Sequence, residues 1–231
     1  MIIKGFQETT MIDYPGHIAA IVFVPRCNFR CPFCYNKSLV NNSDELKEIN
    51  EEEILNFLKK RKKLIDGIVI TGGEPTLYAD LTDFASKVKE IGLLVKIDTN
   101  GTNPDLIKKL LEKKLVDYIA MDIKNCPEKY EKTAGMGVDV EKIKKTVQII
   151  MDSGIDYEFR TTCLPLIIGK EDFVKIGEWL KGAKKYCIQQ FKPLGELIDA
   201  SLMNETSYSH DALIELKTLL EPYFKKVEVR V

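Results

Sequence analysis

The chain has 231 residues, of which 45% are hydrophobic and 30% charged, and its formal net charge at pH 7 is −1. This composition fits a globular fold with a full core and excludes a disordered chain, and no apolar run approaches the roughly 18 residues that a bilayer requires. The small charge argues against a nucleic-acid protein held by phosphate neutralisation, and the first residues lack the layout of a signal peptide, so we expect a cytoplasmic enzyme or binding module with neither nucleic acid nor membrane as a partner.

Short apolar runs typical of β-strands recur along the chain, each followed by a segment with helical periodicity. The predicted strands lie at 18–24, 67–71, 94–99, 118–124, 157–162 and 185–191. A last strand-like run at 226–231 could pair at a sheet edge or with the N-terminal segment. The helical segments begin at side chains that favour N-caps and carry apolar residues on one face. The candidate caps are Asn50, Asp80, Asn103, Asp139 and Ser209.

Six β-α units with right-handed crossovers predict an α/β fold in which a parallel sheet is covered by helices. Such a sheet could be open and doubly wound, or it could curve into an incomplete (β/α)6 TIM-like barrel of parallel strands with outer helices, because six units are too few for a closed eight-unit barrel. We expect a single domain over residues 1–231, with a core at about 16–192 and a C-terminal helix and strand at about 209–231.

Unusual residues gather in the loops that follow the first four predicted strands. Three cysteines follow the first strand, Gly-Gly-Glu-Pro follows the second, Asp-Thr-Asn-Gly follows the third, and Asp122 with Lys124 end the fourth. Because the carboxyl ends of parallel strands share one mouth of the fold, we expect these residues to meet in an active site. Hydrophobic patterning gives no other reason for them.

The clustered cysteines, Cys27, Cys31 and Cys34, stand at spacings of four and three. Thiolates bind zinc and iron–sulfur clusters, but a structural zinc site takes four ligands. A cubane cluster held by three thiolates leaves one iron open to a substrate or cofactor. The alternatives are three buried thiols, a four-ligand iron–sulfur electron carrier, or a zinc site completed by a distant residue. The candidates for that fourth zinc ligand are Cys126, Cys163 and His17.

The order Cys27, Cys31, Phe33, Cys34 after the first strand resembles the Cys-x-x-x-Cys-x-aromatic-Cys signature of the radical S-adenosylmethionine (radical SAM) superfamily. The resemblance implies that the three cysteines hold a [4Fe–4S] cluster whose fourth iron binds the amino and carboxylate groups of SAM. One electron then cleaves SAM to methionine and a 5′-deoxyadenosyl radical, which abstracts a hydrogen atom. The resemblance also implies that Phe33, Cys34 and Tyr35 lie beside the adenine.

The motif TGGEP at 71–75 is similar to the GGE motif of that family, which meets the SAM amino group. Glycines let backbone carbonyls approach a ligand closely, and an ammonium group needs acceptors such as a carboxylate. The matching residues of this chain are Gly72, Gly73 and Glu74.

DTNG at 98–101 and DIK at 122–124 resemble a narrower subgroup, the activating enzymes of glycyl-radical enzymes. In that subgroup the matching residues approach the methionyl and ribose groups of SAM, which assigns cofactor binding to Asp98, Asp122, Ile123 and Lys124. Some members also hold a monovalent cation there, which would involve Asp98, Thr99 and Asp122. Asp122 and Lys124 are two residues apart, so a strand would point both side chains to one face.

The IDYPG segment at 12–16 and the cysteine loop together resemble most closely the activating proteins of anaerobic ribonucleotide reductase. This likeness implies an activase that takes a hydrogen atom from a glycine of a partner glycyl-radical enzyme and receives electrons from a flavodoxin- or ferredoxin-type donor. An alternative keeps the SAM chemistry but acts on a small molecule, as 7-carboxy-7-deazaguanine synthases do. Arg160 and residues 189–193 could also contact SAM, and we expect Cys126, Cys163 and Cys187 to be buried free thiols.

Overall fold

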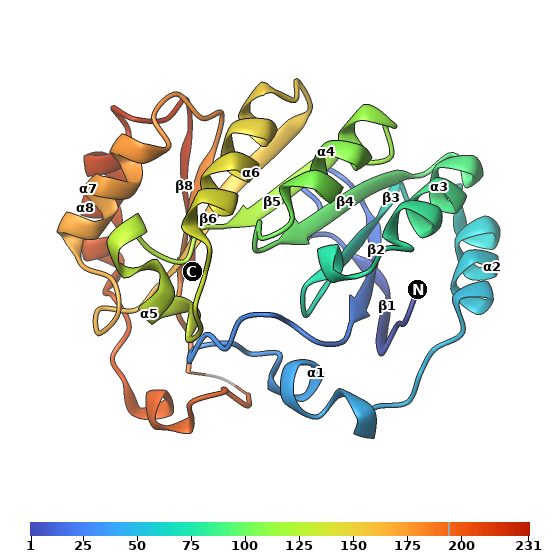
Figure 1. Cartoon of the computed structure of the whole chain (residues 1–231), viewed down its shortest axis with the longest axis horizontal. Coiled ribbons are helices and arrows are strands. Elements are labelled where there is room, and N and C mark those ends of the chain that lie inside the picture. Colours follow the sequence, from blue (N-terminus) through green and yellow to red (C-terminus); the bar gives the residue numbers. More distant parts are fainter. Residues whose placement is uncertain (194) are drawn as a thin grey trace.

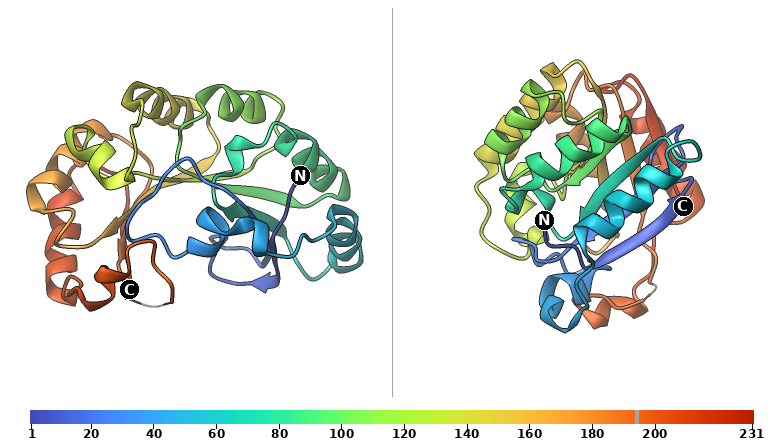
Figure 2. Two further views of the ribbon diagram at one scale, coloured as in Figure 1. Left: turned by 60° about the horizontal axis from the view of Figure 1, so that its bottom comes forward. Right: turned by 90° about the vertical axis from the view of Figure 1, so that its right-hand side faces the viewer.

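A computed structural model describes residues 1–193 and 195–231 of the chain, in which eight strands form one sheet whose neighbours follow the chain order. The strands are β1 (Gly5–Thr10), β2 (Ala19–Val24), β3 (Gly67–Gly72), β4 (Leu94–Thr99), β5 (Tyr118–Asp122), β6 (Asp156–Cys163), β7 (Tyr186–Gln190) and β8 (Val227–Arg230). Figure 2 shows the sheet curved into an arch with the helices along its outer side. The arch is the incomplete barrel that the repeated β-α units predict.

The six predicted strands are confirmed as β2 to β7, and they run parallel to one another. The C-terminal run forms β8, which lies parallel beside β7 at the edge of the sheet. The strand β1 was not predicted, and it pairs antiparallel with β2, so the sheet is mixed rather than wholly parallel. Most of β1 is exposed or half-buried, which leaves no apolar run for a sequence pattern to detect.

The helices follow the strands in the expected alternation, with two short additions at α1 and α5. They are α1 (Lys37–Asn41), α2 (Glu51–Arg61), α3 (Leu81–Ile91), α4 (Pro104–Glu112), α5 (Tyr130–Ala134), α6 (Val140–Asp152), α7 (Lys170–Trp179) and α8 (His210–Leu220). The predicted side-chain caps are confirmed at Asn50, Asn103, Asp139 and Ser209, each of which accepts a hydrogen bond from a backbone amide of the first turn. Asp80 stands at the N-cap of α3 without such a bond.

Two layers of buried residues result from this arrangement. The larger lies between the sheet and the helices and includes Val95, Ile97 and Ile119. A smaller apolar cluster lies on the inner face of the arch and includes Tyr14, Val69 and Ala120. Because side chains alternate along a strand, β4 and β5 also place charged residues on this inner face, at the end where their loops begin.

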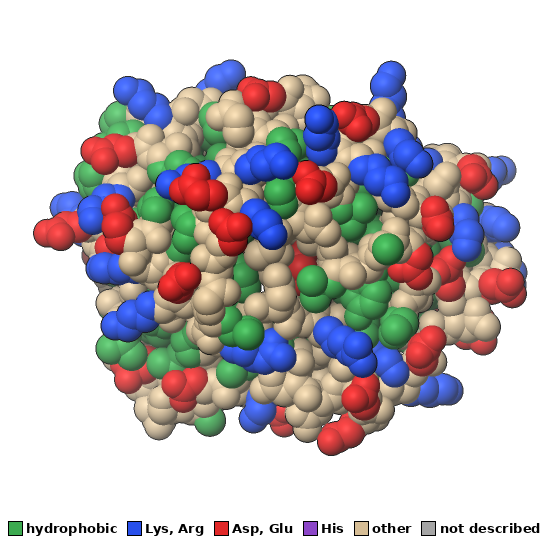
Figure 3. Space-filling view, in the orientation of Figure 1, with side chains coloured by type: hydrophobic (Ala, Val, Ile, Leu, Met, Phe, Trp, Pro, Cys, Tyr) green, Lys and Arg blue, Asp and Glu red, His purple; other side chains and the backbone are tan. Residues whose placement is uncertain are grey.

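Acidic and basic side chains are intermixed over the face of the molecule displayed in Figure 3, in keeping with the small net charge. Among the helices of the described residues, none is both long enough and apolar enough to cross a bilayer.

Candidate active site

A cavity of about 320 Å³ lies where the carboxyl ends of the parallel strands meet. Nearly all of the residues that the motifs single out line it: Cys27, Cys31, Phe33, Cys34, Tyr35, Gly72, Gly73, Glu74, Asp98, Thr99, Asp122 and Lys124. The strand ends therefore bring together motifs that are almost 100 residues apart in the chain, as the parallel topology predicts.

The loop that carries the three cysteines follows β2 and is fastened to its neighbours mainly by backbone hydrogen bonds. Arg26 adopts a φ of +61°, a left-handed conformation that is uncommon outside glycine, and its carbonyl accepts a hydrogen bond of 2.8 Å from the amide of Glu74. The amide of Arg30 donates to the carbonyl of Ala134 at the end of α5. Asn36 donates its side-chain amide to the carbonyl of Gly72 at 2.7 Å. The cysteine loop is thus held in one position by β3 and α5.

The segment after β7 packs against the other side of the cysteine loop. Tyr35 exchanges two hydrogen bonds of 2.7 Å with Lys192, donating to its carbonyl and accepting from its amide. The Tyr35 ring also stacks on Phe191, with 6.1 Å between ring centroids. The amides of Ile198 and Asp199 donate to the carbonyls of Cys34 and Pro32. Tyr35 lies at the rim of the cavity, where it is 43% exposed.

Close packing at Gly73 joins the second motif to the cysteine loop. A Cβ at this position would lie only 1.7 Å from the carbonyl oxygen of Arg26, so only glycine fits without a movement of backbone. Gly72 has a φ of +117°, which also favours glycine. The two glycines therefore let β3 and the cysteine loop approach each other at the cavity wall.

Glu74 is buried, and its carboxylate joins the second motif to the third. Its Oε1 accepts hydrogen bonds from Thr76 and from the hydroxyl of Thr99, and its Oε2 accepts one from the amide of Asn100. Burial raises the pKa of this carboxyl, while these donors act in the opposite direction. The side-chain amide of Asn100 extends the network to Asn28 in the cysteine loop at 2.8 Å. The carboxylate of Glu74 therefore holds the loops in place.

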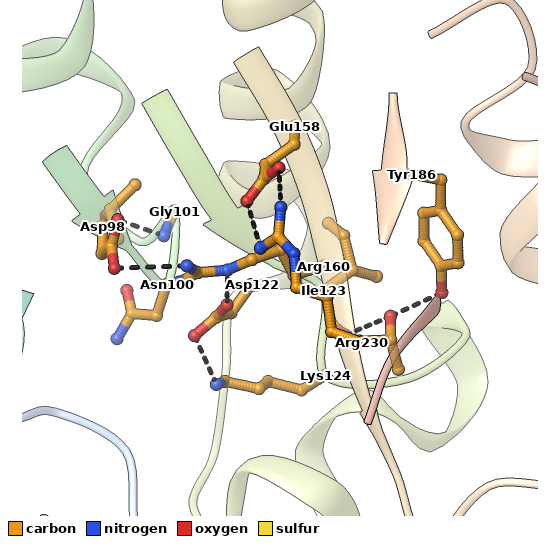
Figure 4. A network of polar contacts seen from close by, with 12 residues as sticks. Asp98, Asn100, Gly101, Asp122, Ile123, Lys124, Glu158, Arg160, Tyr186 and Arg230 are labelled. Carbon is orange, nitrogen blue, oxygen red and sulfur yellow. Dashed lines mark hydrogen bonds and ion pairs between the residues drawn. The ribbon is translucent and has the colours of Figure 1, made fainter. Parts of the chain in front are cut away.

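Asp98 and Asp122 lie on the inner face of β4 and β5 and share one cationic partner, Arg160 of β6 (Figure 4). Arg160 Nη1 lies 3.2 Å from Asp98 Oδ2, and its Nε lies 2.8 Å from Asp122 Oδ1. Lys96 contacts Asp98 Oδ1, and Lys124 contacts Asp122 Oδ2 at 3.1 Å. Burial acts to raise the pKa of Asp122, but the charges of Arg160 and Lys124 lower it to about 2, so this carboxyl is ionised at neutral pH.

Comparison with known protein families decides which of the possible thiol sites this cavity represents. The family model of the radical SAM superfamily matches residues 21–180, which include the three cysteines, the GGE motif and both aspartates. The chain belongs to the radical SAM superfamily. Membership implies a [4Fe–4S] cluster and SAM as the cofactors of this cavity.

Relatives within the superfamily include activating enzymes. A protein of Methanocaldococcus jannaschii, provisionally named a glycyl-radical enzyme activating enzyme, is 34% identical over 99% of this chain and 95% of its own length. The pyruvate formate-lyase-activating enzyme of Streptococcus mutans is 28% identical over 84% of this chain and 76% of its own. The chain is thus an enzyme of the radical SAM type with relatives among glycyl-radical activating enzymes.

Solved structures share the fold. The crystal structure of Streptococcus suis SuiB bound to its precursor peptide SuiA superposes with a TM-score of 0.71 at 14% identity, and the match covers 91% of this chain and 48% of SuiB. This chain therefore spans about half the length of SuiB. A domain of a pyruvate-formate lyase-activating enzyme from Bacteroides vulgatus gives a TM-score of 0.59 at 13% identity and covers 71% of this chain and 99% of that domain.

The donor set of the cavity suits the iron–sulfur cluster of the radical SAM family. Three thiols from one loop line the cavity, and thiolate is the ligand that such clusters require. Burial, reinforced by the charge of Glu74, raises the pKa of Cys27 to about 12, whereas Lys124 lowers it. Burial also raises the pKa of Cys31, again against the effect of Lys124. Binding iron would displace the thiol protons, and Lys124 is placed to stabilise the thiolates that result.

The residues that could have completed a zinc site are not among those that line the cavity. Cys126 is fully buried, and its Sγ lies 3.6 Å from Asp172 Oδ1. Cys163 is also fully buried, and its thiol donates a hydrogen bond to the carbonyl of Gln189. His17 lies 3.8 Å from Asp66. Over residues 1–193 and 195–231, no three His, Cys, Asp or Glu side chains are placed to bind one metal ion, and this includes the three clustered cysteines. A cubane differs from a zinc site in this respect, because each thiolate binds a different iron of the cluster. Cys187 is fully buried too, so the three scattered cysteines are free thiols in the core, as predicted.

One predicted site residue, Ile123, does not line the cavity. It is fully buried in the layer between sheet and helices, because strand alternation turns it away from Asp122 and Lys124. Its backbone forms hydrogen bonds with β6. The amide donates to the carbonyl of Arg160, and the carbonyl accepts from the hydroxyl of Thr161.

Several lining residues were given no role from the sequence. Asn36, Asn100 and Thr162 belong to this group. Asn100 is part of the DTNG motif, so the motif itself was a signal for it. Arg160, Gln189 and Gln190, for which a SAM contact was only considered, also line the cavity.

Proposed function

We propose that this chain is a radical SAM activase that installs a glycyl radical on a partner enzyme, with an anaerobic ribonucleotide reductase as the expected partner. The observation that carries the proposal is the likeness to a glycyl-radical activating relative over almost the whole of both chains. Cys27, Cys31 and Cys34 would hold the [4Fe–4S] cluster. A flavodoxin- or ferredoxin-type donor would reduce the cluster, which would then supply the electron for cleavage of SAM and for the removal of a hydrogen atom from glycine.

The chain's own residues bind and orient SAM in this proposal. Phe33 is almost fully buried in the cavity wall, and Lys124 Nζ lies 6.0 Å from its ring centroid. A flat apolar ring beside a fixed cation suits a ligand with an adenine at one end and a carboxylate at the other. The backbone at Gly72 and Gly73 also lines the cavity, where it would offer carbonyl acceptors to the SAM ammonium group.

The shape of the sheet suits a macromolecular substrate. The strand order begins at β1 and ends at β8, so the sheet is an arch whose two edge strands do not pair to close a barrel. We expect a loop of a partner protein to enter the cavity past its exposed rim at Tyr35 and to bring a glycine backbone to the reactive carbon. Tyr35, which is 43% exposed at the cavity rim and stacks on the buried ring of Phe191, offers an aromatic surface for such a loop.

The proposal is tested with anaerobically reconstituted protein, dithionite and SAM. The expected product is 5′-deoxyadenosine, and addition of anaerobic ribonucleotide reductase should generate the doublet of a glycyl radical in electron paramagnetic resonance. The matched control is the same partner with its radical-bearing glycine replaced by alanine, which should give no doublet.

A different outcome would separate the alternatives. If 5′-deoxyadenosine forms but no glycyl radical is detected on any glycyl-radical enzyme, the activase proposal is wrong. Turnover of a pterin-like substrate without a protein partner would instead assign the chain to the 7-carboxy-7-deazaguanine synthase type.

A further inference from the structure

The inner face of the arch holds more positive than negative charge at the place where some activating enzymes bind a monovalent cation. Asp98 and Asp122 contribute two carboxylates, while Lys96, Arg160 and Lys124 contribute three cationic groups in direct contact with them. If all five side chains are ionised, the cluster carries a net charge of about +1.

Each oxygen of the two carboxylates already has a cationic partner. Asp98 Oδ1 contacts Lys96 and Asp98 Oδ2 contacts Arg160 Nη1 at 3.2 Å. Asp122 Oδ1 contacts Arg160 Nε at 2.8 Å and Asp122 Oδ2 contacts Lys124 at 3.1 Å. A potassium or sodium ion at this place would have to share these oxygens with a guanidinium or an ammonium group, and the positive charges of Lys96, Arg160 and Lys124 would repel it.

The third expected cation ligand, Thr99, is engaged as well. Its hydroxyl donates to Glu74 Oε1 at 2.7 Å and accepts a hydrogen bond of 3.1 Å from the amide of Gly101. Its side chain is 3% exposed, so it has little room to turn toward a new partner. The set of Asp98, Thr99 and Asp122 therefore does not fit a monovalent cation as these residues are arranged.

Arg160 is the residue that closes the site to a cation. Its guanidinium bridges Asp98 and Asp122 with two donors, and only 11% of its side chain is exposed. The planar fork of arginine suits this bridge because its donors are held in fixed directions, whereas a lysine in the same place offers one compact charge. Figure 4 shows Arg160 extending from β6 toward the two carboxylates.

We propose that the side chain of Arg160, supported by Lys96 and Lys124, takes the place of a bound monovalent cation. The enzyme would then bind SAM without potassium or sodium. Arg160 is in this sense a positioning residue, because it fixes Asp98 and Asp122 and leaves an excess of positive charge for the carboxylate of SAM. The inference rests on the proposed function only in taking SAM as the ligand of the cavity.

The test measures SAM affinity by anaerobic equilibrium dialysis of the cluster-loaded protein in potassium, sodium or tetramethylammonium chloride at equal ionic strength. The thermal unfolding midpoint of the same protein without SAM is recorded in each salt. For the wild type we expect SAM dissociation constants that agree within about twofold across the salts and a midpoint that does not respond to potassium.

The variant Arg160→Met removes the bridging charge and leaves two neighbouring carboxylates. We expect its SAM affinity in tetramethylammonium chloride to fall by about tenfold or more, with substantial recovery in potassium or sodium chloride. The double variant Asp98→Asn with Arg160→Met removes one negative charge as well, so it should lose the response to potassium and also covers the case in which the single variant folds poorly. Arg61→Met on the outer helix α2 is the matched control and should behave as the wild type.

A saturable rise of wild-type SAM affinity or of its unfolding midpoint with potassium or sodium would overturn the proposal. An Arg160→Met protein that loses SAM affinity but does not respond to either ion would also overturn it, because Arg160 would then act as a SAM ligand and not in place of a cation. If SAM binds in none of the salts, the proposed function fails, while the unfolding midpoints still decide whether the site takes a cation.

Discussion

Replacing Gly73 by alanine tests how closely the GGE motif and the cysteine loop must approach each other. The added Cβ would lie 1.7 Å from the carbonyl oxygen of Arg26. Non-bonded carbon–oxygen distances of this kind are about 3.3 Å or more, so the backbones at Gly73 and Arg26 would have to move apart by about 1.5 Å. Two hydrogen bonds of 2.8 Å cross this contact, from the amides of Gly73 and Glu74 to the carbonyls of Val24 and Arg26. A separation of that size would stretch both beyond the usual limit.

The expected destabilisation of the fold has two sources, the steric overlap at Gly73 and the loss of the two backbone hydrogen bonds. A forced overlap in a packed region destabilises a protein by about 1–3 kcal/mol, and each lost backbone hydrogen bond adds about 1 kcal/mol. We therefore expect Gly73→Ala to lower the free energy of unfolding by about 3–5 kcal/mol and the thermal unfolding midpoint by about 6–20 °C. Because the movement separates the walls of the cavity, the variant should also lose SAM affinity.

The matched control is Gly137→Ala, where an added Cβ meets nothing within 4 Å. This substitution should change the free energy of unfolding by less than about 0.5 kcal/mol and leave SAM affinity unchanged. The assay is thermal unfolding of the anaerobic protein, followed by equilibrium dialysis with SAM. A Gly73→Ala protein with the midpoint and SAM affinity of the control would refute the proposed contact between the two loops.

Two further predictions concern charge and metal binding. Burial acts to raise the pKa of Glu158, but its hydrogen bonds to Arg230 and nearby positive charges lower it to about 2, below the ordinary value of 4.5. The pair therefore stabilises the fold above about pH 4.5 by about 3 kcal/mol, and this contribution is lost as the pH falls toward 2. The unfolding midpoint of Glu158→Gln should accordingly fall less than that of the wild type between about pH 5 and 3, and equal losses would contradict the pairing. Cys31→Ala should abolish iron binding after anaerobic reconstitution, whereas Cys126→Ala should keep it; iron retained by Cys31→Ala would contradict the assignment of the cluster ligands.

Much of the site could be predicted because the features that form it are local. Loops after successive parallel strands open on one side, so the motif at each strand end could be placed at a common site. Strand alternation also placed Asp122 and Lys124 on one face, and the structure has both in the cavity. The same alternation, applied to Ile123, would have excluded it from the cavity lining.

The partners of individual polar groups could not be predicted, because they come from distant parts of the chain. The carboxylate of Glu74, for which a contact with the SAM ammonium group is expected, accepts hydrogen bonds from Thr99 and from the amide of Asn100, which lie 25 and 26 residues further on. Lys96 stands in a strand beside apolar neighbours, where alternation alone allows a solvent-facing side chain. Only the curvature of the sheet encloses it, leaving it 1% exposed and in contact with Asp98.

The strand β1 shows the same limit for the fold. Its residues Gly5–Thr10 have little apolar pattern, and their strand conformation depends on pairing with β2. Strand prediction from propensity and periodicity depends on the types and spacing of side chains. An edge strand of this kind is stabilised instead by backbone hydrogen bonds to its neighbour, so it leaves no such pattern.

Electron paramagnetic resonance of the reduced, oxygen-free protein before and after addition of SAM tests most directly whether three thiolates leave one iron open to this ligand. We expect about four iron atoms per chain, as a [4Fe–4S] cluster requires. The spectrum of the reduced cluster should change when SAM is added, because the amino and carboxylate groups of SAM would then bind the open iron. A protein without such a cluster, or one whose spectrum is the same with and without SAM, would contradict the account.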